Sequence, residues 1–111
     1  MIFLFSKLLS ITRIDSLEAV LSEVSGEERI TILNKLSSLH IKLNPNVSYD
    51  YAAQAYELSK KKNNKIGIVG SLNNIGHYFR EINDFDQAIE NFKQALEICR
   101  KLKDDCDIAN I

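Results

Sequence analysis

The stretch from Leu72 to Leu102 constrains the fold of this chain more than any other part of the sequence. Apolar residues recur there every three or four positions, in two runs separated by the polar pair Asn83-Asp84. This spacing predicts two amphipathic helices joined by a short turn. The apolar positions are Leu72, Ile75, Phe79 and Ile82 in the first run, and Phe85, Ala88, Ile89, Phe92, Ala95, Leu96, Cys99 and Leu102 in the second. We therefore expect an antiparallel helical hairpin.

The turn between the two runs carries the residues that a tight helix-to-helix connection needs. Asn83 tolerates a left-handed backbone conformation better than most residues. Asp84 can cap the second helix, and Gln87 stands three residues later, as a capping box requires. Gly76 and Ala88 are small, so they allow the two helices to approach closely.

The same hairpin occurs a second time in the sequence. A shift of 39 residues brings Leu33-Asn34 onto Leu72-Asn73, and a shift of 40 brings Ala55 onto Ala95. The difference of one residue falls in the turn around Pro45, where an insertion costs least. The chain is therefore expected to hold two copies of one helical unit.

The second copy resembles the tetratricopeptide repeat. The residues that carry the resemblance are Leu72, Ile75-Gly76, Phe79, Asn83-Asp84-Phe85, Ala88, Phe92 and Ala95, while the proline usual after the second helix is missing. The resemblance implies an all-α fold in which antiparallel hairpins stack as a right-handed α-solenoid. It also implies that the first helix of each hairpin lines a concave surface on which partner peptides lie.

The rest of the chain divides around these two copies. Asp15 with Glu18 and Ser25 with Glu28 read as capping boxes that open two helices, and Asn44-Pro45 separates the second of these from the next. We expect an apolar segment and capping helix at 1–24, repeats at 25–64 and 65–104, and the start of a third repeat at 105–111. That makes about five helices and the beginning of a sixth.

Composition and motifs argue against several functional classes. With 14 basic and 15 acidic residues, the chain has no net field to attract nucleic acid or an anionic membrane. No glycine-rich phosphate loop, metal-ligand motif or nucleophile with a nearby base is present. We therefore expect no enzymatic activity, no cofactor and no metal.

The candidate binding residues lie on the polar face of the first helix of each repeat. Asn73, His77 and Arg80 share one face because they are spaced i, i+4 and i+7. The shift of 39 pairs Asn73 with Asn34 and His77 with Ser38. By resemblance, Asn74 occupies a position where the family often carries an asparagine that binds the ligand's backbone. The alternative is that all six are ordinary solvated residues.

Together these features predict a non-enzymatic scaffold that binds a protein or peptide in a concave groove. The alternative is a regulatory or sensor segment of a longer bacterial signalling protein, such as a histidine kinase, cyclase or transcription regulator. We expect a cytoplasmic location, or an exported or periplasmic one if 1–14 is the remnant of a signal peptide. This segment is too short for stable membrane insertion and is interrupted by Lys7.

The apolar stripe of the last helix has no full neighbouring repeat in the sequence. Repeat arrays need a polar cap on such a surface. We therefore expect either a longer array or self-association through the apolar ends of the chain.

Overall fold

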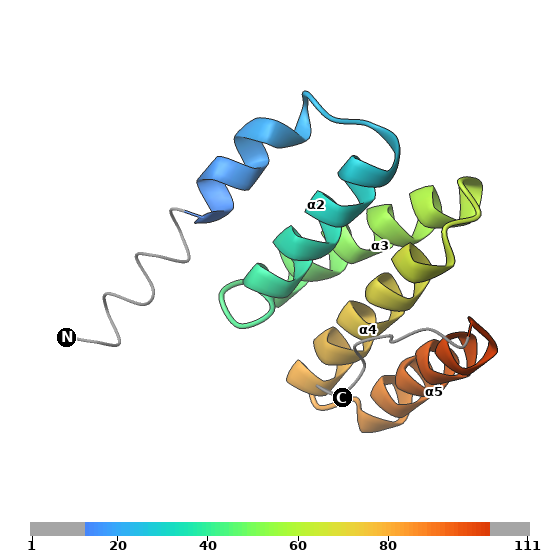
Figure 1. Ribbon diagram of the computed structural model, residues 1–111. Helices are drawn as coiled ribbons and strands as arrows, with labels where there is room; N and C mark the ends of the chain where they lie inside the picture. The colour runs from blue at the N-terminus through green and yellow to red at the C-terminus, as the bar shows by residue number, and fades with distance from the viewer. Residues whose placement is uncertain (1–12, 103–111) are drawn as a thin grey trace.

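A computed structural model describes residues 13–102 of the chain (Figure 1). It contains a helical segment at 13–21, followed by α2 (Gly26–His40), α3 (Pro45–Lys61), α4 (Lys65–Glu81) and α5 (Phe85–Leu102). No strand occurs within 13–102. The expected all-α fold is confirmed, whereas the expected third-repeat start at 105–111 lies outside the described residues.

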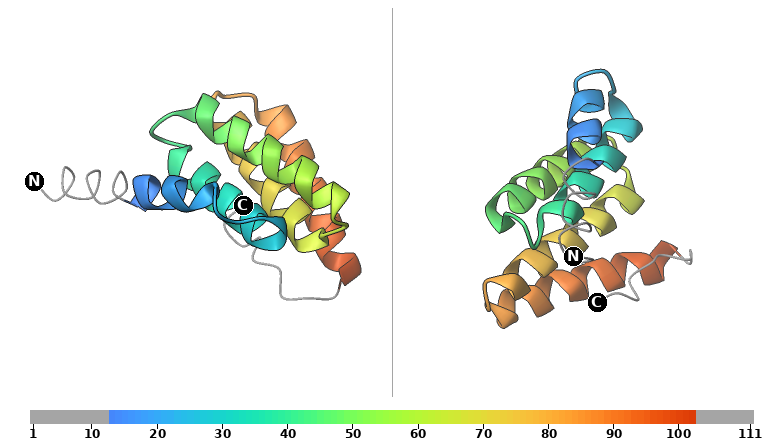
Figure 2. Two further views of the ribbon diagram at one scale, coloured as in Figure 1. Left: turned by 90° about the horizontal axis from the view of Figure 1, so that it is seen from above. Right: turned by 90° about the vertical axis from the view of Figure 1, so that its left-hand side faces the viewer.

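The four labelled helices form two antiparallel hairpins stacked side by side. Each helix packs against the next one along the chain, and α2 also contacts α4. The two first helices, α2 and α4, therefore share one side of the stack, as the three views show (Figures 1 and 2). This arrangement is the one expected of a helical-repeat solenoid.

Asparagine and aspartate side chains determine where three of the helices begin. Asn44 Oδ1 accepts a hydrogen bond from the Val47 amide at 3.4 Å, and Asn64 Oδ1 accepts one from Gly67 at 2.9 Å. Asp84 Oδ1 accepts one from the Gln87 amide at 3.3 Å. Each bond satisfies an amide that has no partner within its own helix. The expected cap at Asp84 is confirmed.

The two asparagine turns take the left-handed conformation. Asn83 has a φ of 66° in the turn between α4 and α5, and Asn63 has a φ of 53° in the turn between α3 and α4. Asparagine accepts this conformation at lower cost than most residues because its short polar side chain can form local hydrogen bonds. The interpretation of Asn83 is therefore confirmed, and Asn63 does the same in the preceding turn.

Both expected capping boxes near the start of the chain are wrong. Asp15 lies inside the first helix, because residues 13 and 14 are already helical and Ile14 is buried. Ser25 does precede α2, but its side chain makes no capping hydrogen bond. Gly26 enters α2 with a φ of +61°, so the chain does not follow the extended-to-helical path of a capping box.

Within each hairpin, small residues lie where the two helices cross. In α4–α5, a Cβ atom at Gly76 would lie 2.5 Å from a carbon of the Phe92 ring, which confirms the expected close approach. In α2–α3, Ser37 and Ser48 are both fully buried, and each hydroxyl donates to the other residue's main-chain carbonyl, at 2.8 and 2.7 Å. The same shifts that define the repeat bring this serine pair onto Gly76 and Ala88.

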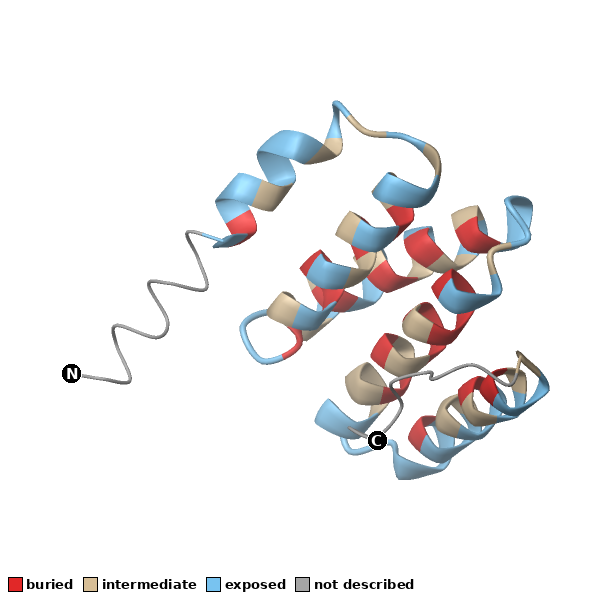
Figure 3. Ribbon diagram, viewed as in Figure 1, coloured by how far each residue is buried: buried red, intermediate tan, exposed pale blue. Residues whose placement is uncertain are grey.

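Buried residues lie mainly where neighbouring helices face one another (Figure 3). Ile30, Leu33 and Leu36 of α2 are buried in the first hairpin, together with Ala52 and Ala55 of α3. Between α4 and α5 the core consists of Ile68, Val69, Leu72, Ala95 and Cys99, with Tyr56 and Ile98 packed against it.

Three apolar residues expected to face inward are exposed instead. They are Ile82, Phe85 and Ile89, and Leu43 is exposed as well. Leu43 and Ile82 lie in the turns that follow α2 and α4. Phe85 and Ile89 are 57% and 51% exposed because, among the described helices, only α4 packs against α5. The apolar stripe of α5 is thus wider than the surface that α4 covers.

Candidate functional site

Two adjoining hollows run between α2 and α4. The first has a volume of about 360 Å³ and is lined by residues that include Asn34, Lys35 and Ile66. The second, of about 480 Å³, is lined by residues that include Lys42, His77 and Arg80. Both hollows share Ser38, Asn73 and Asn74, so they form one continuous depression. We call it the α2–α4 groove.

The structure brings all six candidate residues to this groove. Asn34 lies in the first hollow, and His77 and Arg80 lie in the second. The other three, Ser38, Asn73 and Asn74, lie where the hollows meet. The helical spacing therefore places the candidates on one surface. Their burial and their hydrogen-bond partners differ.

Asn34 and Asn74 hold the two sides of the groove together. The Asn74 amide donates to the main-chain carbonyl of Asn34 at 3.0 Å. The Asn34 amide donates to the carbonyl of Gly67 at 3.4 Å, and its Oδ1 atom accepts a hydrogen bond from the Ser71 hydroxyl at 3.3 Å. These bonds connect α2 to α4 across the groove. Their first effect is to fix the spacing of the two helices.

The Ser38 and Asn73 side chains form no hydrogen bond between α2 and α4 among the described residues. The Ser38 hydroxyl is exposed and donates only to the carbonyl of Lys35 in its own helix, at 2.9 Å. The Oδ1 atom of Asn73 is buried and accepts no hydrogen bond from any residue of the described part. Rotation of this amide would present a donor and an acceptor to a ligand in the groove.

His77 and Arg80 lie next to each other in the second hollow. The His77 ring packs edge-on against Phe92, with ring centroids 5.2 Å apart. Burial, and secondarily the positive charge of Arg80, lower the pKa of His77. Arg80 itself is exposed. At neutral pH, His77 therefore contributes an uncharged polar group and Arg80 a full positive charge.

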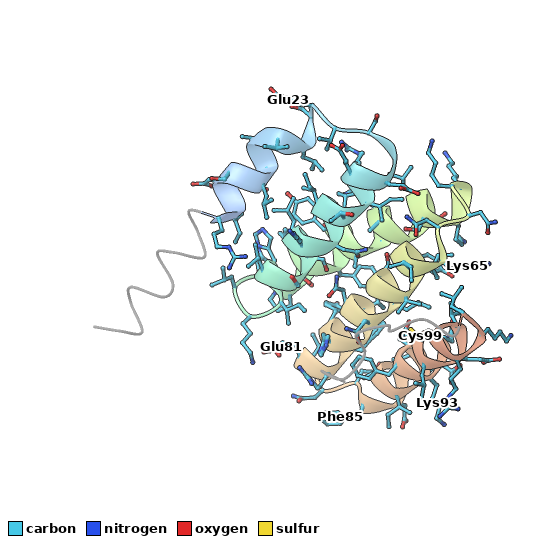
Figure 4. The ribbon with its side chains drawn as sticks, viewed as in Figure 1. Glu23, Lys65, Glu81, Phe85, Lys93 and Cys99 are labelled. Carbon is cyan, nitrogen blue, oxygen red and sulfur yellow. The ribbon has the colours of Figure 1, made fainter. Side chains whose placement is uncertain are left out.

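Two lysines complete the groove, and the sequence prediction had not included them. Lys35 lines the first hollow and Lys42 the second. Lys42 also forms a long ion pair of 3.9 Å with Glu81, at the end of α4 labelled in Figure 4. The available signal was their spacing from Ser38, since Lys35, Ser38 and Lys42 follow the i, i+3, i+7 pattern of one helix face.

The groove presents hydrogen-bonding groups and positively charged side chains. Within residues 13–102, no group of three His, Cys, Asp or Glu side chains is arranged to hold a metal ion. The polar groups of the groove are amides, a hydroxyl, an imidazole and cationic side chains. None of these helices has both the length and the apolar character needed to cross a bilayer.

Comparison with known proteins supports the identification of the second hairpin. Residues 70–102 match the family model described as tetratricopeptide repeat. Searches of curated proteins and of solved structures gave no match. Repeats of this family generally bind protein partners and are generally non-enzymatic. Residues 70–102, which make up most of the α4–α5 hairpin, therefore form a tetratricopeptide repeat.

Proposed function

We propose that this chain is a peptide-binding scaffold whose binding surface is the α2–α4 groove. The observation that carries the proposal is the convergence of Ser38, Asn73, His77 and Arg80 on one depression between the two first helices. Asn34 and Asn74 have a supporting role, since their hydrogen bonds connect α2 to α4.

The groove suits a peptide because much of its shape exists before the ligand arrives. The two helices are fixed relative to each other by hydrogen bonds among Asn34, Ser71, Asn74 and the Gly67 carbonyl. A preformed surface loses less conformational entropy on binding than a flexible one. The amide of Asn73 can then pair with an extended main chain through both a donor and an acceptor.

A peptide-display selection against the full chain, followed by affinity measurements on two variants, tests this proposal. Ser38→Trp fills the point where the two hollows meet, and Gln94→Trp adds the same side chain at an exposed position of α5. Selected peptides should lose at least about tenfold in affinity for Ser38→Trp, or about 1.4 kcal/mol. They should bind Gln94→Trp as tightly as the parent chain. Equal affinity for both variants, or a selection that yields no peptide, contradicts the proposal.

A second copy of the chain is a further partner that the structure favours. Phe85 and Ile89 are exposed apolar side chains four residues apart on α5, and Phe85 lies at the start of that helix (Figure 4). Burying such side chains against a second copy would be favourable. Light scattering should show a mass that rises with concentration and falls to that of a monomer in Ile89→Glu. A strict monomer at all concentrations rules this out.

A further inference from the structure

The α2–α4 groove has a charge that the whole chain does not have. The chain as a whole is nearly balanced, with 14 basic and 15 acidic residues. The residues that line the two hollows nevertheless include Lys35, Lys42 and Arg80 and no aspartate or glutamate. The charge of the groove is therefore positive.

The positive charges lie toward both ends of the groove. Lys35 lines the hollow that also contains Asn64 and Gly67, from the start of α4, and Lys42 and Arg80 line the hollow near the end of α4. Lys35 lies in α2, and Lys42 lies seven residues later in the turn that follows it, which corresponds to about 10 Å at the rise of a helix. An extended peptide covers that distance in about three residues.

These cations have little internal compensation. Among the described residues, neither Lys35 nor Arg80 forms an ion pair. The pair of Lys42 with Glu81 is 3.9 Å long, and the Lys42 side chain is 82% exposed. An exposed pair of this kind contributes little because water and salt screen it. A ligand carboxylate can therefore compete for Lys42.

Apolar residues lie between and beside the charges. Ile66 lines the first hollow, and Leu39, Ile41 and Leu43 line the second. Ile66 and Leu43 are 55% and 37% exposed, so they offer contact area to apolar side chains of a ligand. A fully ionic ligand would leave this area uncovered.

We propose that the ligand of the groove is an extended peptide with acidic side chains spaced about three residues apart and apolar residues between them. One carboxylate pairs with Lys35, and the other pairs with Lys42 and Arg80. This inference rests on the proposed peptide-binding function and adds the chemical class of the ligand.

Fluorescence anisotropy with the full chain and a set of labelled peptides of about twelve residues tests the inference. The reference peptide has two aspartates at positions i and i+3, apolar residues between them and an amidated C-terminus. The other peptides replace both aspartates with asparagine or with lysine, or place the aspartates side by side. We expect the reference to bind tightest, the lysine peptide not to bind, and affinity to fall as salt rises.

Charge-neutral variants assign the effect to named residues. The affinity for the reference peptide should fall about two- to fivefold in each of Lys35→Gln, Lys42→Gln and Arg80→Gln. This is the range typical of exposed ion pairs. Glu81→Gln should raise this affinity, because the substitution removes the carboxylate that competes with the peptide for Lys42. Lys101→Gln is the matched control on α5, where Lys101 is 76% exposed and pairs with Glu97, and it should have no effect.

The outcomes separate this inference from the proposed function. If asparagine and aspartate peptides bind equally and Ser38→Trp abolishes both, the groove binds peptides but the acidic class is wrong. If binding requires a free C-terminal carboxylate rather than the two aspartates, the assignment to side chains is wrong. If no peptide responds to Ser38→Trp, both proposals fail.

Discussion

Glycine, alanine and serine residues determine how closely the two helices of each hairpin pack. Gly76 and Ala88 could be predicted to lie where α4 and α5 approach closely, because small residues stand out in an apolar stripe. Ser37 and Ser48 could not, because serine usually indicates an exposed position. Their burial depends on two reciprocal hydrogen bonds between different helices, which helical spacing does not reveal.

Replacing Gly76 with alanine tests the close approach of α4 and α5. The new methyl group would meet the Phe92 ring at 2.5 Å, and overpacking of this kind costs about 1–3 kcal/mol. The higher helix propensity of alanine offsets about 1 kcal/mol of that cost. Urea unfolding should show a net loss of stability in Gly76→Ala and a smaller loss when Phe92→Leu is also present. The same loss in both backgrounds would show that the ring is not the obstacle.

His77 gives the protein a dependence of stability on pH. Its pKa is lowered in the folded state, so the unfolded chain takes up the proton first as the pH falls. Stability is therefore highest above the ordinary histidine pKa of about 6.5 and decreases below it, until the folded state is protonated as well.

Urea unfolding between about pH 7.5 and pH 5.5 measures this effect before most carboxylates titrate. The free energy of unfolding should decrease as the pH is lowered, and His77→Gln should reduce the slope. Arg80→Gln removes one cause of the lowered pKa, so it should reduce the slope by a smaller amount. A slope that is unchanged in His77→Gln would refute the assignment.

At the level of the elements, local sequence signals were sufficient for three of the helix starts. Asn44-Pro45, Asn64 and Asp84 use only residues within one turn, so a pattern of neighbours can reveal them. The first helix is different. The expected capping boxes at Asp15 and Ser25 were wrong, because residues 13 and 14 are already helical and the Ser25 side chain makes no capping hydrogen bond.

Two contacts hold the first helix against the hairpins. The Tyr51 hydroxyl donates to the Glu18 carboxylate, and Arg29 Nη1 donates to the carbonyl of Leu21 at 2.6 Å. Burial, together with the hydrogen bond and the charge of Glu18, raises the pKa of Tyr51 to about 12. The folded state thus favours the neutral phenol. The resulting stability is present below about pH 10 and is lost as the pH rises toward 12.

A rapid alkaline titration followed by tyrosinate absorbance tests this docking contact. Tyr51→Phe should remove the absorbance that develops near pH 12. Glu18→Ala removes two of the three causes, the hydrogen bond and the charge, so the pKa of Tyr51 should fall toward its ordinary value of about 10. A titration of Tyr51 that is identical with and without the Glu18 carboxylate would show that the first helix is not held in this way.

At the level of the whole molecule, the stacking of two hairpins places α2 and α4 side by side (Figure 2). The repeat in the sequence was sufficient to predict this stacking and the shared surface of Asn34, Ser38, Asn73, Asn74, His77 and Arg80. It could not separate the residues that fix the groove from those that remain available. That distinction depends on which side chains of α2 reach α4, and hence on rotamers and distances rather than on spacing.

Mapping amide chemical shifts of the full chain during titration with a selected peptide tests the central claim most directly. The account predicts that the largest changes cluster on α2 and α4, around Ser38, Asn73, His77 and Arg80. The exposed face of α5, around Phe85 and Ile89, should change little at peptide concentrations that saturate the groove. Changes that cluster on the outer side of α5 and leave α2 and α4 unaffected would contradict the assignment of the groove as the binding surface.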